Sequence, residues 1–236
     1  MNINDFQTTN INLTKRTLLK QVRISSLIIL GWGILPSIAR ASLLRTPRQA
    51  EGPFYPVKKP IDQDADLTFV STRKKRAQGE ICIIRGRVFD VNGRPLSGVL
   101  LEIWQANKWG RYQDKRDKSD LPVDINFQGF GVARTDKNGR YIFKTIRPGG
   151  YSFGGIERTP HIHFRINAVG VNEFISQMYF AGELKNKRDY FLNNILQKER
   201  VVVAFRPMAN GSKVGIFNIV LAYLGKRPDK ECLLSC

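Results

Sequence analysis

Short runs of β-branched, aliphatic and aromatic residues dominate the chain from residue 79 onward. Turn dipeptides separate them, at Asn92-Gly93, Asn138-Gly139, Pro148-Gly149 and Asn210-Gly211. This pattern predicts strands at Ile81–Val88, Val99–Trp104, Tyr141–Ile146, Ile162–Ile166, Phe174–Phe180, Val201–Phe205 and Val214–Leu221. Many short strands with regular turns favour an antiparallel β-sandwich over alternating strands and helices. We therefore expect an all-β fold.

The rest of the pattern adds one helix and one arm. The only helical periodicity is at Lys187–Gln197, late in the chain. Residues 42–78 are charged and rich in proline, which predicts an extended arm over a sandwich domain of residues 79–236. The segments Gly86–Val99 and Thr135–Gly149 each read as strand, Asn-Gly turn and strand. Non-catalytic sandwich modules of the prealbumin type share this pattern, so a binding module of the cell envelope stays an alternative.

Residues 1–41 have the composition of an export signal. A basic stretch precedes the apolar run Ile24–Ala39, whose 16 residues are interrupted by glycine and proline. A membrane-spanning helix needs about 20 apolar residues. The run ends in Ala39-Arg40-Ala41, a signal-peptidase pattern, so we expect cleavage after Ala41 and a periplasmic or secreted protein with no stable membrane span. An uncleaved anchor is the alternative. Thr14–Lys20 resembles a twin-arginine signal with one lysine substituted, so both export routes stay open.

The chain is strongly basic, with 38 Lys and Arg against 20 Asp and Glu and a net charge of +18. Residues 1–41 hold five of these bases and one acid, so the remainder carries +14. Such an excess is typical of nucleic-acid binders. However, the bases are dispersed and no aromatic stacking motif accompanies them, so we expect no nucleic-acid partner. The excess of basic residues is expected to attract anionic aromatic acids, or simply to suit the surface of an exported protein.

The three cysteines are too few for a thiolate metal site. Cys82 lies inside an expected strand and is most simply a small buried residue. Cys232 and Cys236, near the C-terminus, could pair in an oxidising compartment.

Only two histidines occur in the chain, His161 and His163. Residues i and i+2 of a strand point to the same face, so the pair can present two imidazole nitrogens to one metal ion. The remaining ligands of such a site must be oxygens from Asp, Glu or Tyr. Tyr112 and Tyr151 each stand where a strand meets a loop, and ionised phenols suit a hard trivalent ion such as Fe(III). Each of these side chains could instead be an ordinary core or surface residue.

Several motifs together resemble the intradiol ring-cleavage dioxygenases, above all the iron-bearing β subunit of protocatechuate 3,4-dioxygenase. The resemblance covers nearly all of residues 43–225 and includes the flanking segments Arg45–Ala50 and Phe217–Leu221. Its central motifs are Glu102–Asn107, Gly110–Tyr112, Thr135–Asp136, Asn138–Tyr151, Arg158–Phe164 and Gln177–Phe180.

This resemblance implies one non-haem Fe(III) per chain, bound by Tyr112, Tyr151, His161 and His163. Tyr112 and His161 match the equatorial ligands of the family, and Tyr151 and His163 the axial ones. Tyr151 would also serve as an internal base. Arg158 matches an arginine that stabilises negative charge on the substrate ring, although the residue alone could equally be a surface charge. Gln177 matches a pocket glutamine near the iron.

The implied reaction is cleavage of a catechol by O₂ between its two hydroxylated carbons, giving a diacid of the cis,cis-muconate type. The implied partners are a small aromatic diol, O₂, and either further copies of the chain or an α-type subunit. Phe153 stands where the family commonly has tryptophan, and Gln113-Asp114 replace a basic residue and a histidine. The substrate is therefore protocatechuate or a related catechol, without a choice between them.

Overall fold

The computed structural model describes residues 42–222, all within one compact unit, Arg40–Cys236. The signal peptide expected at 1–41 and the cysteines Cys232 and Cys236 lie outside the described residues. No helix among the described residues is long and apolar enough to cross a membrane.

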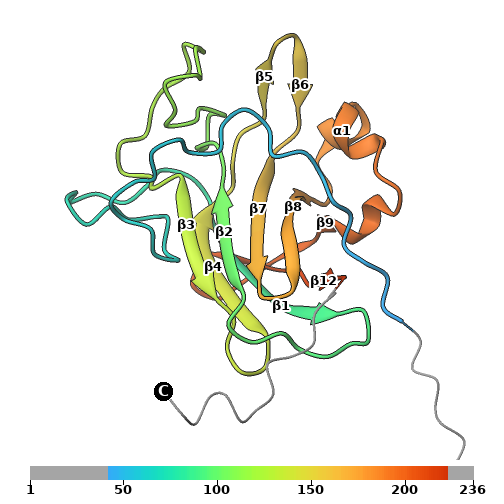
Figure 1. Cartoon of the computed structure of the whole chain (residues 1–236). Coiled ribbons are helices and arrows are strands. Elements are labelled where there is room, and N and C mark those ends of the chain that lie inside the picture. Colours follow the sequence, from blue (N-terminus) through green and yellow to red (C-terminus); the bar gives the residue numbers. More distant parts are fainter. Residues whose placement is uncertain (1–41, 223–236) are drawn as a thin grey trace, which may run out of the picture. The chain divides into compact units, whose positions relative to one another are not determined.

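Two five-stranded sheets form the fold (Figure 1). The first sheet has the order β10-β11-β1-β12, with β4 also paired to β1. Its strands are β1 (Ile81–Asp90), β4 (Arg140–Ile146), β10 (Phe205–Pro207), β11 (Lys213–Ile216) and β12 (Ile219–Leu221). The second sheet has the order β3-β2-β7-β8-β9. Its strands are β2 (Leu100–Trp104), β3 (Phe130–Arg134), β7 (His161–Ala168), β8 (Val171–Phe180) and β9 (Val202–Val203).

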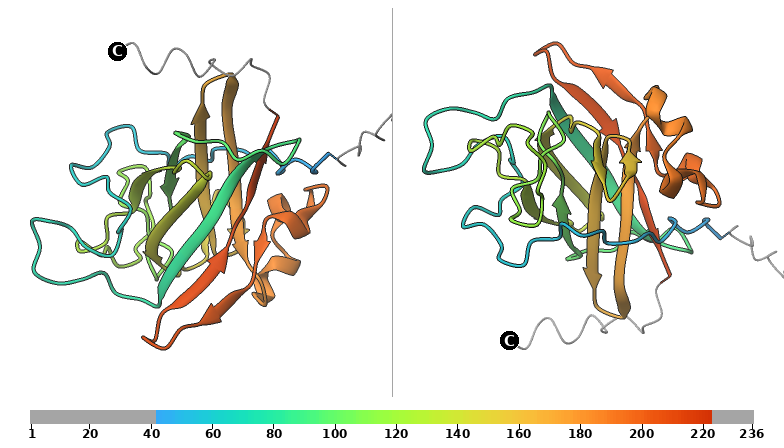
Figure 2. Two further views of the ribbon diagram at one scale, coloured as in Figure 1. Left: turned by 90° about the horizontal axis from the view of Figure 1, so that it is seen from below. Right: turned by 90° about the horizontal axis from the view of Figure 1, so that it is seen from above.

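The expected all-β sandwich is confirmed, although three strand pairs, β1 with β11, β1 with β12 and β8 with β9, are parallel. The long strand β1 crosses the direction of β7 and β8 at an angle (Figure 2), as in packed sheets generally. Alternate residues of β1 face the core, and Cys82, Ile84 and Val88 are completely buried there. The expectation of a buried Cys82 is therefore confirmed.

Residues 42–78 form no helix or strand and lie against both sheets. Gln49 N donates to the Ile175 carbonyl of β8 (2.9 Å), and Leu67 N donates to the Lys144 carbonyl of β4 (2.8 Å). The first part of this arm runs across the side of β7 and β8 in Figure 1. The arm therefore lies against β8, the strand next to the one that carries the histidines.

The late helix is shorter than the pattern over Lys187–Gln197 predicts. α1 spans only Tyr190–Asn193, and single 3₁₀ turns flank it at Leu184–Lys187 and Lys198–Arg200. Asp189 begins the helix as its N-cap, and Gln197 adopts a left-handed conformation (φ 61°) that interrupts the helical path.

Two expected strands are divided in the structure. The segment Val201–Phe205 becomes β9 and the start of β10, and Val214–Leu221 becomes β11 and β12. The second break is at Phe217, whose carbonyl lies above Gly86 and accepts a hydrogen bond from the Tyr141 hydroxyl (2.6 Å). A Cβ at Gly86 would lie 1.9 Å from that carbonyl oxygen, so only glycine leaves room for the displaced strand.

The sequence pattern missed three strands. They are β3, whose sequence contains a glycine, and the short strands β5 (Tyr151–Phe153) and β6 (Ile156–Arg158), which form a hairpin. The hairpin projects beyond the end of the second sheet (Figure 1). Its two ends carry Tyr151 and Arg158, which are directly opposite each other in the register.

Candidate functional site

The six residues singled out from the sequence come together at one end of the second sheet. His161 and His163 begin β7, and Gln177 pairs with His163 from β8. Tyr151 and Arg158 lie at the base of the β5–β6 hairpin, immediately before β7. The sixth residue, Tyr112, comes from the long loop between β2 and β3.

Close backbone contact between two loops brings the tyrosines together. Gly110, two residues before Tyr112, has φ 93°, and a Cβ there would lie 2.2 Å from the Gly150 carbonyl oxygen. A Cβ at Gly149 would lie 2.5 Å from the Gly110 nitrogen. The loops can approach this closely only because both are glycine there. As a result the Tyr112 and Tyr151 rings meet edge to face, with centroids 5.3 Å apart.

The two histidines point their Nε2 atoms toward one another at 3.1 Å. His161 Nδ1 lies 2.7 Å from the Thr159 carbonyl oxygen, which can only accept, so Nδ1 carries the proton and Nε2 presents its lone pair. The His163 ring stacks on Trp104 with centroids 4.7 Å apart. Burial lowers the pKa of His161 to about 3 and that of His163 well below its usual range, so both rings are neutral.

Tyr151 lies beside this pair, and the ring of Tyr112 lies against that of Tyr151. Tyr151 Oη lies 3.5 Å from His161 Nε2, and the buried Tyr112 hydroxyl has no hydrogen-bond partner among the described residues. Burial raises the pKa of Tyr112 well above its usual value and also raises that of Tyr151. The phenols therefore need a nearby cation in order to ionise.

This donor set fits a metal ion. In residues 42–222 no group of three or more His, Cys, Asp and Glu side chains could hold a metal, so a centre here depends on phenol oxygens. Two neutral imidazoles that turn their Nε2 atoms toward each other, a phenol 3.5 Å from one of them and a second phenol with no partner form a donor set that one cation would satisfy together. Hard phenolate oxygens and imidazoles suit trivalent iron.

Arg158 lies in a buried polar network beside the histidines. Its Nη2 donates to Gln177 Oε1 (2.7 Å), and the Tyr179 hydroxyl donates to the same oxygen (3.0 Å). Its guanidinium carbon also lies 4.4 Å from the centre of the Phe191 ring. The side chain of Arg158 is 6% exposed, so a full positive charge is held close to the candidate metal centre.

Asp189 balances that charge and fixes its place. Its Oδ2 accepts from Arg158 Nε (3.0 Å) and from Thr159 N (2.9 Å), and its Oδ1 accepts from Leu192 N (2.8 Å) at the start of α1. Its side chain is fully buried. One carboxylate thus connects the helix to Arg158 and to Thr159, the peptide whose carbonyl orients His161.

A cavity of about 720 Å³ adjoins the centre on the side of Tyr112. Tyr112, Trp104 and Phe54 form part of its wall, and Phe54 stacks on Tyr112 with centroids 4.5 Å apart. Its other lining residues include four basic side chains, Lys58, Lys59, Lys115 and Arg116, and one acidic side chain, Asp114, which pairs with Arg116.

The sequence interpretation assigned no role to Asp189, Tyr179, Thr159 and Phe54. Asp189 carries a usable signal, since an aspartate before Tyr-Phe-Leu is a typical helix N-cap. That signal predicts the start of a helix and cannot predict its contact with Arg158. Phe153, found where the family commonly has tryptophan, is 45% exposed on the hairpin and meets Phe54 edge to face.

Comparison with known proteins identifies the family. A family model described as dioxygenase matches residues 50–222. The chain is 42% identical over 125 residues to the protocatechuate 3,4-dioxygenase beta chain of Burkholderia cepacia, covering 51% of this chain and 53% of that one. It is 32% identical over 152 residues to catechol 1,2-dioxygenase 2 of Acinetobacter lwoffii, covering 58% and 52%. The chain therefore belongs to the intradiol ring-cleavage dioxygenase family.

A solved structure agrees with this assignment. The dioxygenase domain of a dioxygenase carbohydrate-binding protein fusion from Streptomyces sp. SirexAA-E is 29% identical, with a TM-score of 0.57. The match covers 75% of this chain and 98% of that domain. By contrast, the chain spans about half the length of the curated relatives that it matches.

Replacement of Asp189 by asparagine is expected to destabilise the protein by about 3 kcal/mol, because it leaves the buried Arg158 charge without its partner. Urea denaturation of the variant and the parent protein measures this difference. Glu183→Gln, which breaks the more exposed pair with Arg147, is the matched control and should cost less than about 1 kcal/mol. Equal losses in the two variants would contradict the assigned role of Asp189.

The buried histidines predict a pH-dependent stability of the metal-free protein. The ordinary histidine pKa is 6.5, whereas that of folded His161 is about 3. Between these values the unfolded chain binds protons that the folded chain does not, so the free energy of unfolding falls as the pH is lowered from 6.5 and is unaffected above it. Each histidine should contribute up to about 1.4 kcal/mol per pH unit.

Urea denaturation at pH values from about 7 down to about 5 measures this dependence. The double variant His161→Asn/His163→Asn removes both titrations and should have a flatter profile over this range. An identical slope in the variant and the parent protein would show that the acid sensitivity has another origin.

Proposed function

We propose that the chain is a non-haem Fe(III) dioxygenase that cleaves a catechol ring between its two hydroxylated carbons. The observation that carries this proposal is the convergence of His161, His163, Tyr112 and Tyr151 on one buried point. Membership of the intradiol family supports it. One iron per chain would be held by these four side chains.

The iron would supply a Lewis acid that ionises the bound catechol and draws electron density from its ring. The protein supplies the rest of the chemistry. Tyr151 stands at the edge of the centre on the hairpin base, and its oxygen, once ionised to phenolate by the bound cation, would accept a proton from a catechol hydroxyl as an internal base. Tyr112 is the more deeply buried of the two, with 4% of its surface exposed, whereas Tyr151 is half-buried.

Arg158 stabilises the negative charge that develops as the ring reacts with O₂. Its guanidinium is held against Gln177 and Asp189 and cannot turn away, so it needs no reorganisation during the reaction. Gln177 donates its amide hydrogen to the Ala50 carbonyl (2.8 Å) and accepts from Arg158, which fixes its orientation beside the centre. The carbon–carbon bond between the hydroxylated carbons breaks, and both atoms of O₂ enter the product, a cis,cis-muconate-type diacid.

The substrate we propose is protocatechuate or a related catechol that carries a carboxylate. The cavity beside Tyr112 supports this choice because four basic side chains line it. Lys58 and Lys115 take part in no ion pair among the described residues, so their charges are available to an anion. The protocatechuate 3,4-dioxygenase beta chain of Burkholderia cepacia is named for the same substrate.

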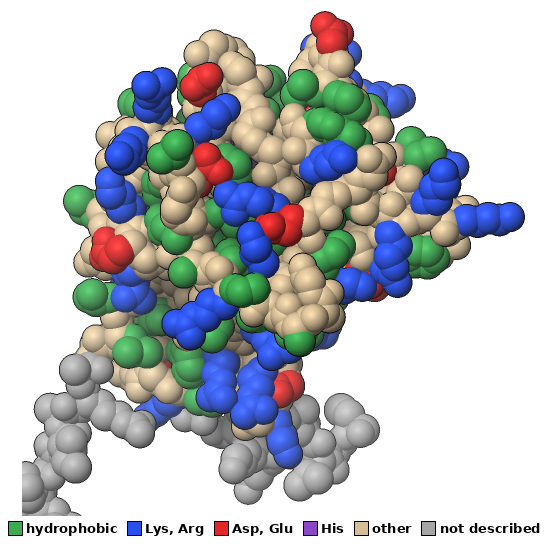
Figure 3. All heavy atoms as spheres, turned by 180° about the vertical axis from the view of Figure 1, so that it is seen from behind, with side chains coloured by type: hydrophobic (Ala, Val, Ile, Leu, Met, Phe, Trp, Pro, Cys, Tyr) green, Lys and Arg blue, Asp and Glu red, His purple; other side chains and the backbone are tan. Residues whose placement is uncertain are grey.

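A non-catalytic binding module of the cell envelope is not favoured. Such a module needs the sandwich, but it does not need two neutral histidines and an unpartnered phenol buried at one point. Basic side chains are spread over the face seen in Figure 3 and are not gathered into a single stripe, which argues against a nucleic-acid partner.

The proposed protein partner is either a further copy of this chain or an α-type subunit. The chain names of protocatechuate 3,4-dioxygenase indicate α and β subunits for that enzyme.

Iron binding and activity test the proposal. The iron-loaded protein should absorb visible light through charge transfer from phenolate to Fe(III), and it should consume O₂ with protocatechuate faster than with unsubstituted catechol. Tyr151→Phe is expected to lower kcat by about 100-fold, because the internal base is lost. His163→Ala should lose most of its iron, as measured by metal analysis.

Tyr190→Phe, at a ring that is 65% exposed on α1, is the control and should leave iron content, colour and rate unchanged. A protein that stays colourless and free of iron after reconstitution would contradict the proposed centre. A coloured protein that prefers catechol would contradict only the proposed substrate.

Export is a separate proposal. We infer that residues 1–41 are removed and that the protein acts in the periplasm or outside the cell. Intact-mass analysis of the protein recovered from those fractions should give a chain that begins at Ser42. A chain that still begins at Met1 would contradict cleavage and favour the membrane anchor.

A further inference from the structure

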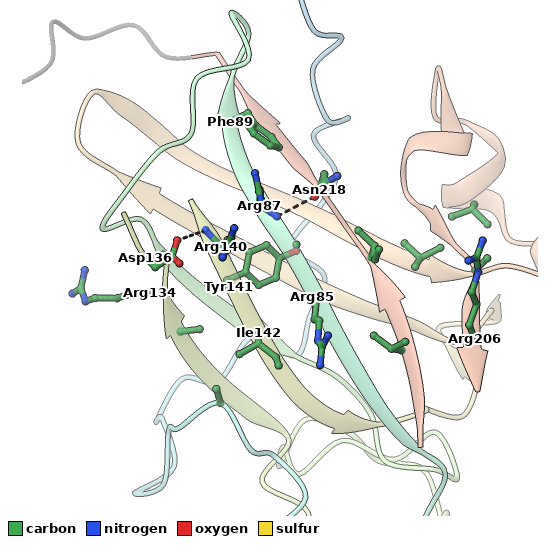
Figure 4. A pocket seen from close by; sticks show the side chains of 18 residues that line it. Arg85, Arg87, Phe89, Arg134, Asp136, Arg140, Tyr141, Ile142, Arg206 and Asn218 are labelled. Atoms are coloured by element: carbon green, nitrogen blue, oxygen red, sulfur yellow. Dashed lines mark hydrogen bonds between the residues drawn. The ribbon is translucent and has the colours of Figure 1, made fainter. Parts of the chain in front are cut away.

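The outer face of the first sheet contains a groove of about 1340 Å³ that the proposed activity does not use. It lies on the side of the first sheet that faces away from β7, whereas the candidate metal centre is built on the second sheet. Five arginines line it, as the close view in Figure 4 shows, namely Arg85, Arg87, Arg134, Arg140 and Arg206.

The strand register brings two of these charges face to face. Arg87 of β1 lies directly opposite Arg140 of β4, and both side chains are exposed on the same side of the sheet. Like charges in directly opposed positions of neighbouring strands destabilise a sheet. One acid lies near the pair: backbone hydrogen bonds lower the pKa of the Asp136 carboxyl, and the charges of Arg140 and Arg87 lower it further, although it forms no ion pair with either. The arginines outnumber this acid, which leaves a net positive charge for an anion.

None of the five arginines belongs to an ion pair among residues 42–222. The one acidic side chain in the groove is Asp136. Its Oδ1 accepts hydrogen bonds from the backbone nitrogens of Asn138 and Arg140, both at 2.8 Å, which closes the turn between β3 and β4. Within residues 42–222 four of the five guanidinium groups donate no hydrogen bond and are free to bind a ligand, whereas Arg134 Nη1 donates to the Gly98 carbonyl (3.3 Å).

The floor between the arginines is apolar. Arg85 is flanked in the register by Ile142 of β4 on one side and Ile216 of β11 on the other. These isoleucines are 49% and 68% exposed, and Phe89 and Val214 extend the same surface. A fully hydrated ion such as polyphosphate would leave this floor uncovered.

We propose that this groove binds a small aromatic polycarboxylate, a ligand whose carboxylates are carried on one or two aromatic rings. Guanidinium groups pair with carboxylates through two parallel hydrogen bonds and stack on aromatic faces. Outward side chains lie about 7 Å apart along a strand and about 5 Å apart between strands, a spacing that suits carboxylates on one ring or adjacent rings.

The groove is unsuited to an acidic peptide that binds as an added strand. β1 is already paired with β4 on one side and with β11 and β12 on the other, so its backbone has no free edge beneath the arginines. Over β1, at the centre of the groove, recognition must therefore come from side chains, which favours a compact ligand with its own rings and charges.

Calorimetric titration of the full chain with a biphenyl tetracarboxylate tests the proposal. Butane tetracarboxylate, which carries the same charge without a ring, should bind at least about tenfold more weakly. The variant Arg87→Ala/Arg140→Ala should weaken binding of the biphenyl ligand by at least about tenfold, because it removes two charge-assisted contacts. Lys74→Ala/Lys75→Ala removes the same charge from exposed positions that do not line the groove and should change the affinity less than about twofold.

A second variant tests the apolar floor. Ile142→Ser/Ile216→Ser should weaken the biphenyl ligand and leave the butane ligand unchanged. Equal losses in the arginine and lysine variants would show attraction by net charge alone and would overturn the proposal. Equal affinity for the biphenyl and butane ligands would overturn the aromatic part of it. Oxygen uptake by the iron-loaded arginine variant should be unchanged, so this test can fail while the proposed dioxygenase activity holds.

Discussion

One buried ion pair, between Asp189 and Arg158, determines the geometry of the candidate metal centre. Both side chains are almost completely enclosed, and burial of two charges costs more free energy than an apolar pair of similar size. The pair is therefore poor evidence of a gain in stability. Its role is to position other groups. The Asp189 carboxylate also accepts a hydrogen bond from Thr159 N, and the carbonyl of Thr159 sets the tautomer of His161. The short helix α1 is thus connected to the metal centre by its N-cap, Asp189, and by Phe191, whose ring packs against Arg158.

The candidate metal centre and the groove on the first sheet differ in how their charged groups are paired. At the centre Arg158 is paired with Asp189, the histidines are neutral, and the phenols ionise only when a cation is nearby. On the outer face of the first sheet, arginines stand beside isoleucines and have no acidic partner among the described residues. The large positive charge of the chain is therefore divided between places with different roles. Part of it forms the wall of a cavity beside Tyr112, and part lines a separate groove.

Much of the fold could be predicted because its strands carry local signals. Alternation of buried and exposed residues along Ile81–Asp90 is visible in the sequence, and the Asn-Gly turns mark the ends of the hairpins. The breaks at Phe217 and in the late helix could not be predicted. The first depends on a carbonyl packed onto Gly86 from a distant strand, and the second on a left-handed residue, Gln197, that no local pattern marks.

The sequence by itself determined which side chains are available for chemistry. Its two histidines at positions i and i+2, its two tyrosines where a strand meets a loop and its family motifs were enough to nominate all six candidate residues. Only the tertiary structure decided what holds them in place and what lies elsewhere. Asp189 reaches Thr159 across 30 residues, and Arg87 faces Arg140 through strand register. Such contacts depend on how separate strands and loops are aligned in space, and no local sequence pattern contains that alignment.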